Sequence, residues 1–163
     1  MDEIVIEQAT IEDLSRLTDL LTDLFSRGDD FIPDRVKQMR GVRLLLEQPG
    51  RGRIFVARQN GGIVGMINLL FTISTAEGGF VILLEDLIVE ESSRHHGVGD
   101  KLLKSAIQYA KDKHFLRITL LTSRLSPDAQ RFFLRHGFYE SKMIPMRLIL
   151  SSDSAENSAP QPV

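Results

Sequence analysis

The chain has 163 residues, of which 42% are apolar and 26% are charged, and its formal net charge is −2. This length fits one domain with a sizeable core, and the composition is that of an ordinary soluble globular protein. The small net charge gives no reason to expect nucleic acid as a partner. The absence of cysteine excludes disulfides, thiolate metal sites and a cysteine nucleophile. No apolar run approaches the roughly 20 residues that span a bilayer, and the Met1-Asp2-Glu3 start is not that of a secretory signal. We therefore expect a cytoplasmic protein with no membrane partner.

The first third of the chain predicts one strand and two helices. Residues 3–8 alternate between apolar and polar, as a half-buried strand does. Thr10 followed by Asp13 is typical of a helix start, and apolar residues then recur at helical spacing over residues 14–25. Pro33 stands where a second helix would begin.

The middle of the chain predicts three strands and a further helix. Residues 53–59 and 63–73 are strands joined through Asn60-Gly61-Gly62, which is typical of a hairpin. A nearly unbroken apolar run over residues 80–89 predicts a strand that is covered on both faces. From residue 98 to about residue 113 the apolar period becomes that of a helix.

The last part of the chain predicts a strand, a short helix and a closing strand. Residues 116–122 should form a strand. A strand–helix–strand unit favours a right-handed crossover, so this strand should be parallel to the one over residues 80–89. Ser126-Pro127 is a good start for a short helix, and Gly137 suits its end. Residues 138–150 should supply one or two closing strands, and the polar tail over residues 151–163 should be disordered.

The connection between the strand over residues 80–89 and the following helix has the composition of an anion site. Gly97 and Gly99 let a ligand approach the backbone, and the first N–H groups of a helix have no partner within it. Arg94 adds a cation whose geometry matches phosphate. The segment is not a Walker loop, because no Gly-Lys-Ser or Gly-Lys-Thr ends it. Leu102 also stands where a dinucleotide-binding loop would have its third glycine.

Two motifs resemble those of the GNAT N-acetyltransferase superfamily. Arg94-His95-His96-Gly97-Val98-Gly99 resembles its acyl-CoA loop, Arg/Gln-x-x-Gly-x-Gly/Ala. Residues 126–138, Ser-Pro-Asp-Ala-Gln-Arg-Phe-Phe-Leu-Arg-His-Gly-Phe, resemble Asn-x-x-Ala-x-x-Phe-Tyr-x-x-x-Gly-Phe. The predicted order β-α-α-β-β-β-α-β-α-β is similar to that of the family. The resemblance implies the three-layer acyl-CoA N-acyltransferase fold, of the α+β / α/β class with a mixed central sheet, as one domain over residues 1–150.

The same resemblance implies that acetyl-CoA is the co-substrate and that its acetyl group passes directly to a primary amine of a small molecule. Backbone groups of Leu87, Ile88 and Val89 would pair with the pantetheine arm. The other cofactor-binding residues that it implies are Arg94, His95, His96, Gly97, Val98, Gly99, Asp100, Ser126, Ala129, Phe132 and Phe133. It implies no metal, and adjacent histidines without a matched carboxylate are better explained as loop residues. Family members often dimerise through their last strands, which makes a homodimer an open expectation.

Glu85 is the predicted catalytic residue. A carboxylate can take the proton of the acceptor amine, and the family's base often occupies this position. Strand alternation would place Glu85 on the face of Leu87 and Val89 and Asp86 on the opposite face. Desolvation in an apolar strand would raise the pKa of Glu85. Glu85 could instead pair with an arginine across the sheet or bind a cationic substrate.

The proton donor is where the sequence departs from the family. Phe133 stands where the family has its usual acid, a tyrosine, and Ser126, Tyr139 or water could replace it. The departure leaves a non-catalytic acyl-CoA-binding or sensing module as an alternative. A protein N-terminal or lysine acetyltransferase and a nucleotide-binding domain are further alternatives. Asp29 and Asp30, near the expected acceptor site, could attract a cationic amine or be solvated turn residues.

Overall fold

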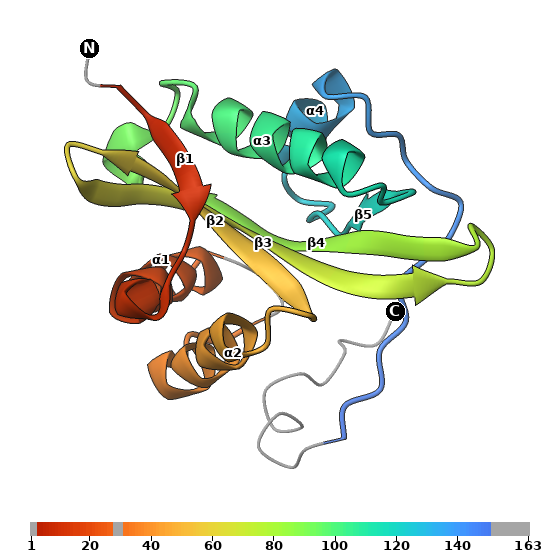
Figure 1. Ribbon diagram of the computed structural model, residues 1–163, viewed down its shortest axis with the longest axis horizontal. Helices are drawn as coiled ribbons and strands as arrows, with labels where there is room; N and C mark the ends of the chain where they lie inside the picture. Colours follow the sequence, from red (N-terminus) through yellow and green to blue (C-terminus); the bar gives the residue numbers. More distant parts are fainter. Residues whose placement is uncertain (1–2, 28–30, 151–163) are drawn as a thin grey trace. The chain divides into compact units, whose positions relative to one another are not determined.

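The computed structural model describes residues 3–27 and 31–150 (Figure 1). The chain divides into two compact units, one formed by Met1–Leu24 and Pro33–Leu121, the other by Phe25–Ile32 and Thr122–Val163. The first unit contains the sheet. The second contains a short helix and the extended segment that follows it. The predicted tail over residues 151–163 and the predicted turn acids Asp29 and Asp30 lie outside the described residues.

The sheet of the first unit has five strands in the order β1-β2-β3-β4-β5. Their bounds are β1 Val5–Gln8, β2 Gly52–Gln59, β3 Gly62–Ser74, β4 Gly79–Val89 and β5 Ile118–Leu120. Each neighbouring pair from β1 to β4 is antiparallel, and β5 is parallel to β4. The predicted mixed sheet, with its parallel pair around the helix after β4, is confirmed.

The β2–β3 hairpin follows from its two turn residues. Asn60 and Gly61 both have positive φ, 52° and 79°, as a two-residue turn of the type favoured in hairpins requires. Asparagine and glycine reach this left-handed backbone region more readily than other residues do. The local sequence therefore determined this connection.

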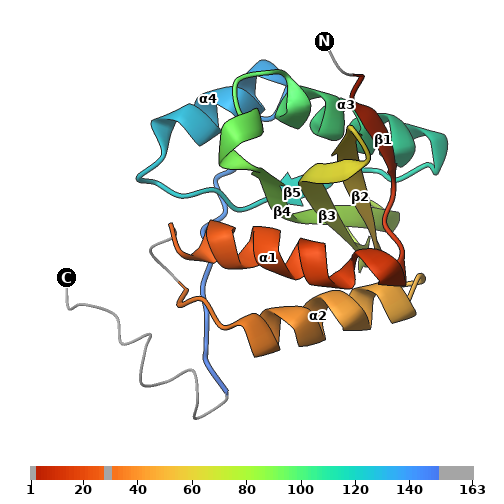
Figure 2. The same ribbon diagram turned by 90° about the vertical axis from the view of Figure 1, so that its left-hand side faces the viewer.

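Helices cover both faces of the sheet. Helices α1 (Leu14–Phe25) and α2 (Arg35–Glu47) lie on one face, and α3 (Val98–Asp112) lies on the other (Figure 2). A short 3-10 turn, η1 (Ile11–Asp13), precedes α1, and there the Thr10 N–H donates to the Asp13 carboxylate at 2.9 Å. This contact fits the predicted helix start.

Helix α2 begins later than the sequence predicted. Pro33 is not its first residue, because Asp34 is the N-cap and its carboxylate accepts the N–H groups of Val36 and Lys37, each at 3.1 Å. A side-chain oxygen at this position satisfies helix N–H groups that have no partner within the helix. The competing capping signal at Asp34 therefore outweighed the proline signal.

The core of the first unit consists of aliphatic side chains between the sheet and its helices. Its largest fully buried members include Leu17, Met66, Ile67, Leu69, Ile82, Leu102 and Leu103. They come from α1, β3, β4 and α3, so the two strands that lead to the predicted cofactor loop are anchored on both faces. Burial of each such side chain contributes roughly 1.5–3 kcal/mol.

The second unit differs from the prediction after its helix. Helix α4 (Pro127–Arg135) has Ser126 as its N-cap, as expected, and its side chains are at most half-buried. The predicted closing strands are wrong, because residues 138–150 form no strand in the part of the chain that the structure describes. A strand needs a partner for its backbone N–H and C=O groups, and no described strand pairs with this segment. Its large apolar side chains after Phe138 are exposed, namely Tyr139, Met143, Ile144, Met146, Leu148, Ile149 and Leu150.

Candidate functional site

Strand β4 has neighbours on both sides along only part of its length. β3 pairs with it from Gly79 to Val89, whereas β5 pairs only with the stretch from Ile82 to Leu84. Further hydrogen bonds, from Leu116 N to Phe80 O at 3.0 Å and from Ile82 N to Arg117 O at 2.9 Å, extend that contact back to Phe80. We call Phe80–Leu84 the closed half of β4 and Glu85–Val89 the open half.

The outer edge of the open half has no strand beside it among the described residues. The predicted pantetheine-binding residues Leu87, Ile88 and Val89 all lie in this half. Unpaired backbone groups at a sheet edge can hydrogen-bond an extended ligand as though it were another strand. The edge therefore meets the first requirement of the predicted site.

A β-bulge marks the junction of the two halves. Asn68 of β3 is opposite Asp86 and Leu69 is opposite Leu84, which leaves Glu85 as the extra residue of β4. Strict alternation does not hold across a bulge, so it cannot assign the Glu85 side chain to the face of Leu87. Glu85 is exposed, whereas Asp86 is only 9% exposed. The desolvation expected at Glu85 therefore acts on Asp86.

Among the described residues, one hydrogen-bond donor and no cation act on the buried acid Asp86. The carboxamide Nδ2 of Asn68, itself 4% exposed, donates to Asp86 Oδ2 at 2.9 Å. Burial raises the pKa of Asp86 to about 6; the bond from Asn68 lowers it, and the negative charge of Glu85 raises it. Sequence reasoning missed this residue, because alternation placed Asp86 on the face away from the acyl group.

The loop before α3 has the backbone of an anion site. His95 and Gly97 have left-handed φ values of 62° and 80°, and Gly97 is the N-cap of α3. Such left-handed residues next to a helix start turn successive N–H groups toward one concave space. A Cβ added at Gly97 would meet no atom within 4 Å, so the space beside this backbone is open. Val98 is 1% exposed and fixes the first turn of the helix in the core.

Arg94 is tied to two elements. Its Nε donates to the carbonyl oxygen of Val89 at 2.9 Å, and its Nη2 lies 3.7 Å from Asp23 Oδ2 on α1. The first contact holds the loop against the end of the open half. The second partly neutralises the guanidinium, so Arg94 is a phosphate ligand only where a phosphate competes with Asp23.

The remaining predicted residues of the loop are exposed or half-buried. His95 and His96 are exposed, and Asp100 pairs with Lys104 one turn along α3 at 2.9 Å. Gly99 lies in the first turn of α3 and is half-buried. Within residues 3–27 and 31–150, no group of three or more His, Cys, Asp or Glu side chains could hold a metal ion. No described helix is long and apolar enough to cross a membrane.

The later predicted residues lie in the second unit. Ser126 Oγ accepts the N–H of Ala129 at 3.4 Å, so this hydroxyl caps α4. The Phe133 ring packs edge-on against Phe132 and Phe138, with centroids 5.2 and 5.7 Å apart. Their contact with the cofactor stays a prediction, as does the identity of the proton donor.

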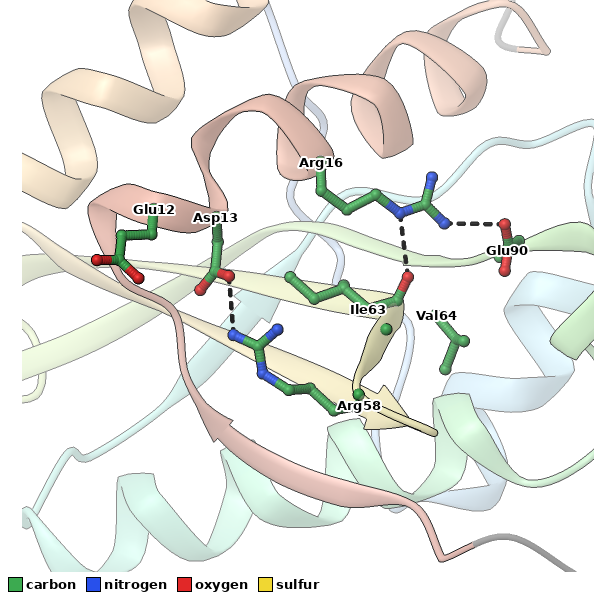
Figure 3. Close-up of a pocket in the computed structure, with 9 residues that line it drawn as sticks. Glu12, Asp13, Arg16, Arg58, Ile63, Val64 and Glu90 are labelled. Atoms are coloured by element: carbon green, nitrogen blue, oxygen red, sulfur yellow. Dashed lines mark hydrogen bonds and ion pairs between the residues drawn. The ribbon is translucent and has the colours of Figure 1, made fainter.

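A shallow hollow of about 410 Å³ lies beside the start of α1 (Figure 3). Arg58 donates to Asp13 at 2.8 Å, and Arg16 donates both to Glu90 at 2.8 Å and to the carbonyl oxygen of Ile63 at 3.1 Å. These contacts join α1 to the β2–β3 hairpin and to the residue that follows β4.

Asp13 in this hollow is held in its ionised form. Burial alone would raise the pKa of Asp13, but hydrogen bonds from the Thr10 N–H and from Arg58 outweigh it, and the pKa is lowered. Because its arginines are paired with carboxylates, the hollow is better explained as a brace for α1 than as a ligand site.

The five-stranded mixed sheet with helices on both faces matches the acyl-CoA N-acyltransferase fold. The solved structure of a possible acetyltransferase from Clostridium difficile 630 shares it, with a TM-score of 0.83 at 18% identity over 91% of this chain and 98% of that one. The sequence model of the Acetyltransferase (GNAT) family matches residues 14–138, which is more than half of the 163-residue chain. The protein belongs to this family, and the resemblance seen in its two motifs is confirmed.

Three further known proteins resemble between a third and nine-tenths of the chain. Streptothricin acetyltransferase A of Bacillus subtilis (strain 168) is 39% identical over 56 residues, 34% of this chain and 32% of that protein. The aminoalkylphosphonate N-acetyltransferase of Salmonella typhimurium (strain LT2) is 30% identical over 86 residues, 53% of this chain and 56% of that protein. The chain thus spans about a third and just over half of these two curated relatives. The solved structure of aminoglycoside N-acetyltransferase AAC(6')-Iy with CoA matches with a TM-score of 0.77 at 18% identity, over 91% of this chain and 96% of that one. At that identity the likeness supports the fold alone.

Proposed function

We propose that the protein transfers the acetyl group of acetyl-CoA to a primary amine of a small molecule. The observation that carries the proposal is the continuity of the open half of β4 with the left-handed loop at the start of α3. An unpaired strand edge can bind the amide groups of pantetheine, and a helix N-terminal loop can bind pyrophosphate. The two sites follow each other along the chain, as the corresponding parts of acetyl-CoA do.

The chain's own residues would hold the co-substrate through backbone groups more than through side chains. Leu87 and Ile88 would face the pantetheine arm, while the carbonyl oxygen of Val89 already accepts from Arg94. The backbone N–H groups from His95 to Asp100 would surround the pyrophosphate. Gly97 is the critical position, since a side chain there would enter the space that the ligand needs.

Acetyl transfer needs an amine with a free electron pair. The nitrogen attacks the thioester carbonyl carbon, so a C–N bond forms, the C–S bond breaks and CoA leaves as a thiolate that takes up a proton. The amine loses one further proton when it enters as an ammonium ion. Glu85, an exposed carboxylate at the bulge, would attract this ammonium group.

A small-molecule acceptor is supported by the names of the relatives. Streptothricin acetyltransferase and aminoalkylphosphonate N-acetyltransferase name small molecules as their acceptors. Because the chain spans only part of both, these names support the class of acceptor and no single compound.

Calorimetric titration with acetyl-CoA tests the co-substrate site. Wild-type protein should bind, and Gly97→Trp should lose the binding. Gly78→Trp is a matched control, because Gly78 also has a left-handed φ, 77°, with open space around a Cβ, but it precedes β4 at the far end of the strand. Equal loss in both variants would indicate backbone strain instead of a blocked site. A wild type that does not bind acetyl-CoA would contradict the proposal.

A second function is favoured by one observation. Phe133 has no proton to donate, so the protein could bind acyl-CoA without turning it over. Free CoA thiol, measured across a panel of aminoglycosides, aminoalkylphosphonates and polyamines, separates the two functions. Binding without thiol release would favour the sensing module. If wild-type protein does turn over and Phe133→Tyr is no faster, the missing hydroxyl is not limiting.

A further inference from the structure

Asp86 is a buried acid whose described contact, a hydrogen bond from Asn68, does not require a negative charge. It is 9% exposed, the other buried side chains of β4 are apolar, and no cation acts on it among the described residues. An ionised carboxylate in such a place is costly unless it is paired. Asp86 also lies next to the predicted site. It follows the bulge residue Glu85, and it begins the paired stretch of β4 that has no described strand on its other side.

We propose that Asp86 is the proton acceptor for the acceptor amine and that Asn68 is the residue that positions it. The proposal rests on the proposed acetyl transfer and names the group that makes the amine nucleophilic. It moves the role of base from Glu85, which is exposed, to the neighbouring buried carboxyl group.

The Asn68 carboxamide has one satisfied end and one unsatisfied end. Its Nδ2 donates to Asp86, but its Oδ1 is buried and has no hydrogen-bond partner in the described structure. A buried acceptor without a donor is unfavourable, and most such groups in folded proteins find a partner. This oxygen is closed to bulk solvent, and Asp86 is the side chain that hydrogen-bonds the other end of the same carboxamide.

A protonated Asp86 would supply that donor. The ionised carboxylate accepts from Nδ2, as observed, and the neutral carboxyl group carries an O–H that can turn to Oδ1 of the same carboxamide. Asn68 can therefore support both protonation states of its partner. A purely structural pair would need only one of these states.

The charges around Asp86 also favour proton uptake. From the facing strand β3 the partner is the neutral Asn68, and within β4 the neighbour is Glu85, a like charge. Burial is the larger influence and raises the pKa of Asp86 to about 6. A base with a pKa near the working pH is effective, since it is mostly ionised at rest and still holds a proton well.

The proposed step is balanced. An acceptor R–NH₃⁺ gives one proton to Asp86, directly or through one water, and becomes R–NH₂. The nitrogen then attacks the acetyl carbon, the C–S bond breaks, and the second proton lost by nitrogen balances protonation of the CoA thiolate. Asp86 returns its proton to solvent after product release. Glu85 attracts the ammonium group and does not take the proton.

Asp86→Asn is the central test, because the new amide can donate to Asn68 Oδ1 and keeps the shape of the pair. We expect acetyl-CoA affinity within about twofold of wild type, no loss of thermal stability at pH 8, and a fall in kcat/KM for the amine of roughly 10²- to 10⁴-fold. Retained kcat/KM in a folded Asp86→Asn protein would overturn the proposal.

Glu85→Gln keeps the test decisive even if Asp86→Asn does not fold. The profile of kcat/KM against pH should show an acid limb near pH 6 in wild type, and this limb should persist in Glu85→Gln at lower pH, because the variant removes a like charge. A limb that disappears in Glu85→Gln would assign the base to Glu85 and overturn the proposal. The acceptor should be an alkylamine with a pKa of about 10, so that its own titration lies outside this window.

Asn68→Leu tests the positioning role. The variant removes both the donor and the acceptor of the carboxamide. The acid limb of the kcat/KM profile should then move to higher pH, because the hydrogen bond from Asn68 lowers the pKa of Asp86. Acetyl-CoA binding should remain. Lower stability with an unmoved limb would show that Asn68 is only structural. Failure of the underlying acetyl transfer is recognised separately, since wild-type protein would then release no CoA thiol with any amine.

Discussion

The closed half and the open half of β4 share one neighbour, β3, and differ in what lies along the other edge. In the closed half the buried side chains, Val81, Ile82 and Leu84, are apolar, and β5 completes the backbone pairing. In the open half Asp86 is buried beside an edge that no described strand occupies. The first kind of burial stabilises the sheet, whereas the second changes the proton affinity of a side chain.

The difference originates in one inserted residue. The bulge at Glu85 lets β4 keep its pairing with β3 on both sides of the junction. Bulges bend a strand and increase its local twist, which fits the end of the β5 contact at Leu84. The junction is therefore where the strand changes from a structural to a proposed chemical role.

The largest expected effect is that burial of Asp86 in the open half makes the stability of the fold depend on pH. The pKa of Asp86 is about 6 in the folded protein against 3.8 for the ordinary group, so between these pH values the folded state binds more protons than the unfolded state. Stability should then fall as pH rises from 3.8 to 6, by up to about 3 kcal/mol from this group, and stay lowered above pH 6. Asp86→Asn should remove this component and be more stable than wild type at pH 8.

Urea denaturation from pH 4 to pH 8 measures the effect as the difference between wild type and Asp86→Asn. Asp128→Asn is the control, because Asp128 lies on the exposed face of α4 and its side chain is 93% exposed. If the free energy of unfolding depends on pH in the same way for wild type and Asp86→Asn, the ionised Asp86 does not destabilise the fold and the prediction is wrong.

A matched pair of glycines gives the second test. A Cβ at Gly65, which is opposite Val89 in the open half, would lie 3.0 Å from Ile88 O, 3.1 Å from a Leu102 methyl carbon and 3.2 Å from one of Val98. Gly65→Ala should therefore cost roughly 1–3 kcal/mol. It should also weaken acetyl-CoA binding, since the new methyl group pushes β4 and α3 away from β3.

Gly79→Ala is the counterpart at the other end of β4. Its Cβ would be tight only against the Leu116 side chain, at 3.0 Å from the Cδ1 atom, and a flexible side-chain end can shift. We expect a smaller loss of stability, measured by thermal unfolding, and unchanged acetyl-CoA affinity. Equal losses of affinity would mean that the two ends of β4 are equally coupled to the loop.

Local rules explain which parts of this molecule could be predicted from sequence. The hairpin at Asn60-Gly61 and the left-handed turn at Gly97 depend on the backbone preferences of the residues themselves. The cap at Ser126 likewise depends on a single hydroxyl and the next few N–H groups. Features of this kind, together with the helix periods, were sufficient for the strands and helices up to α4 and for the left-handed backbone of the predicted cofactor loop.

Pairing between distant segments explains what could not be predicted. The bulge at Glu85 depends on how β4 aligns with β3, and β4 has no glycine or proline near that point to mark it. The segment over residues 138–150 has strand-like apolar residues, but a pattern within one segment does not show whether a partner edge exists. Asp86 was missed and a closing strand was wrongly predicted for the same physical reason.

The smallest expected effect concerns the charge at the end of the open half. Asp23 lies 3.7 Å from Arg94, which also holds the carbonyl oxygen of Val89. Asp23→Asn should leave Arg94 in place through that second contact and raise the positive potential of the loop. A partly exposed ion pair is worth about 0.2–1 kcal/mol, so acetyl-CoA affinity should rise by a factor of roughly 1.5–5 at low salt.

Asp19→Asn provides the matched control, since Asp19 lies on the same helix and pairs with Arg35 at 3.0 Å instead of with the loop. The two variants change the net charge equally, so only a local effect at Arg94 can separate them. Calorimetric titrations at two salt concentrations should show a gain for Asp23→Asn that shrinks as salt screens it. An equal gain for Asp19→Asn would mean that acetyl-CoA responds to the overall field of the protein, and that Arg94 serves the open half as a structural tie more than as a phosphate ligand.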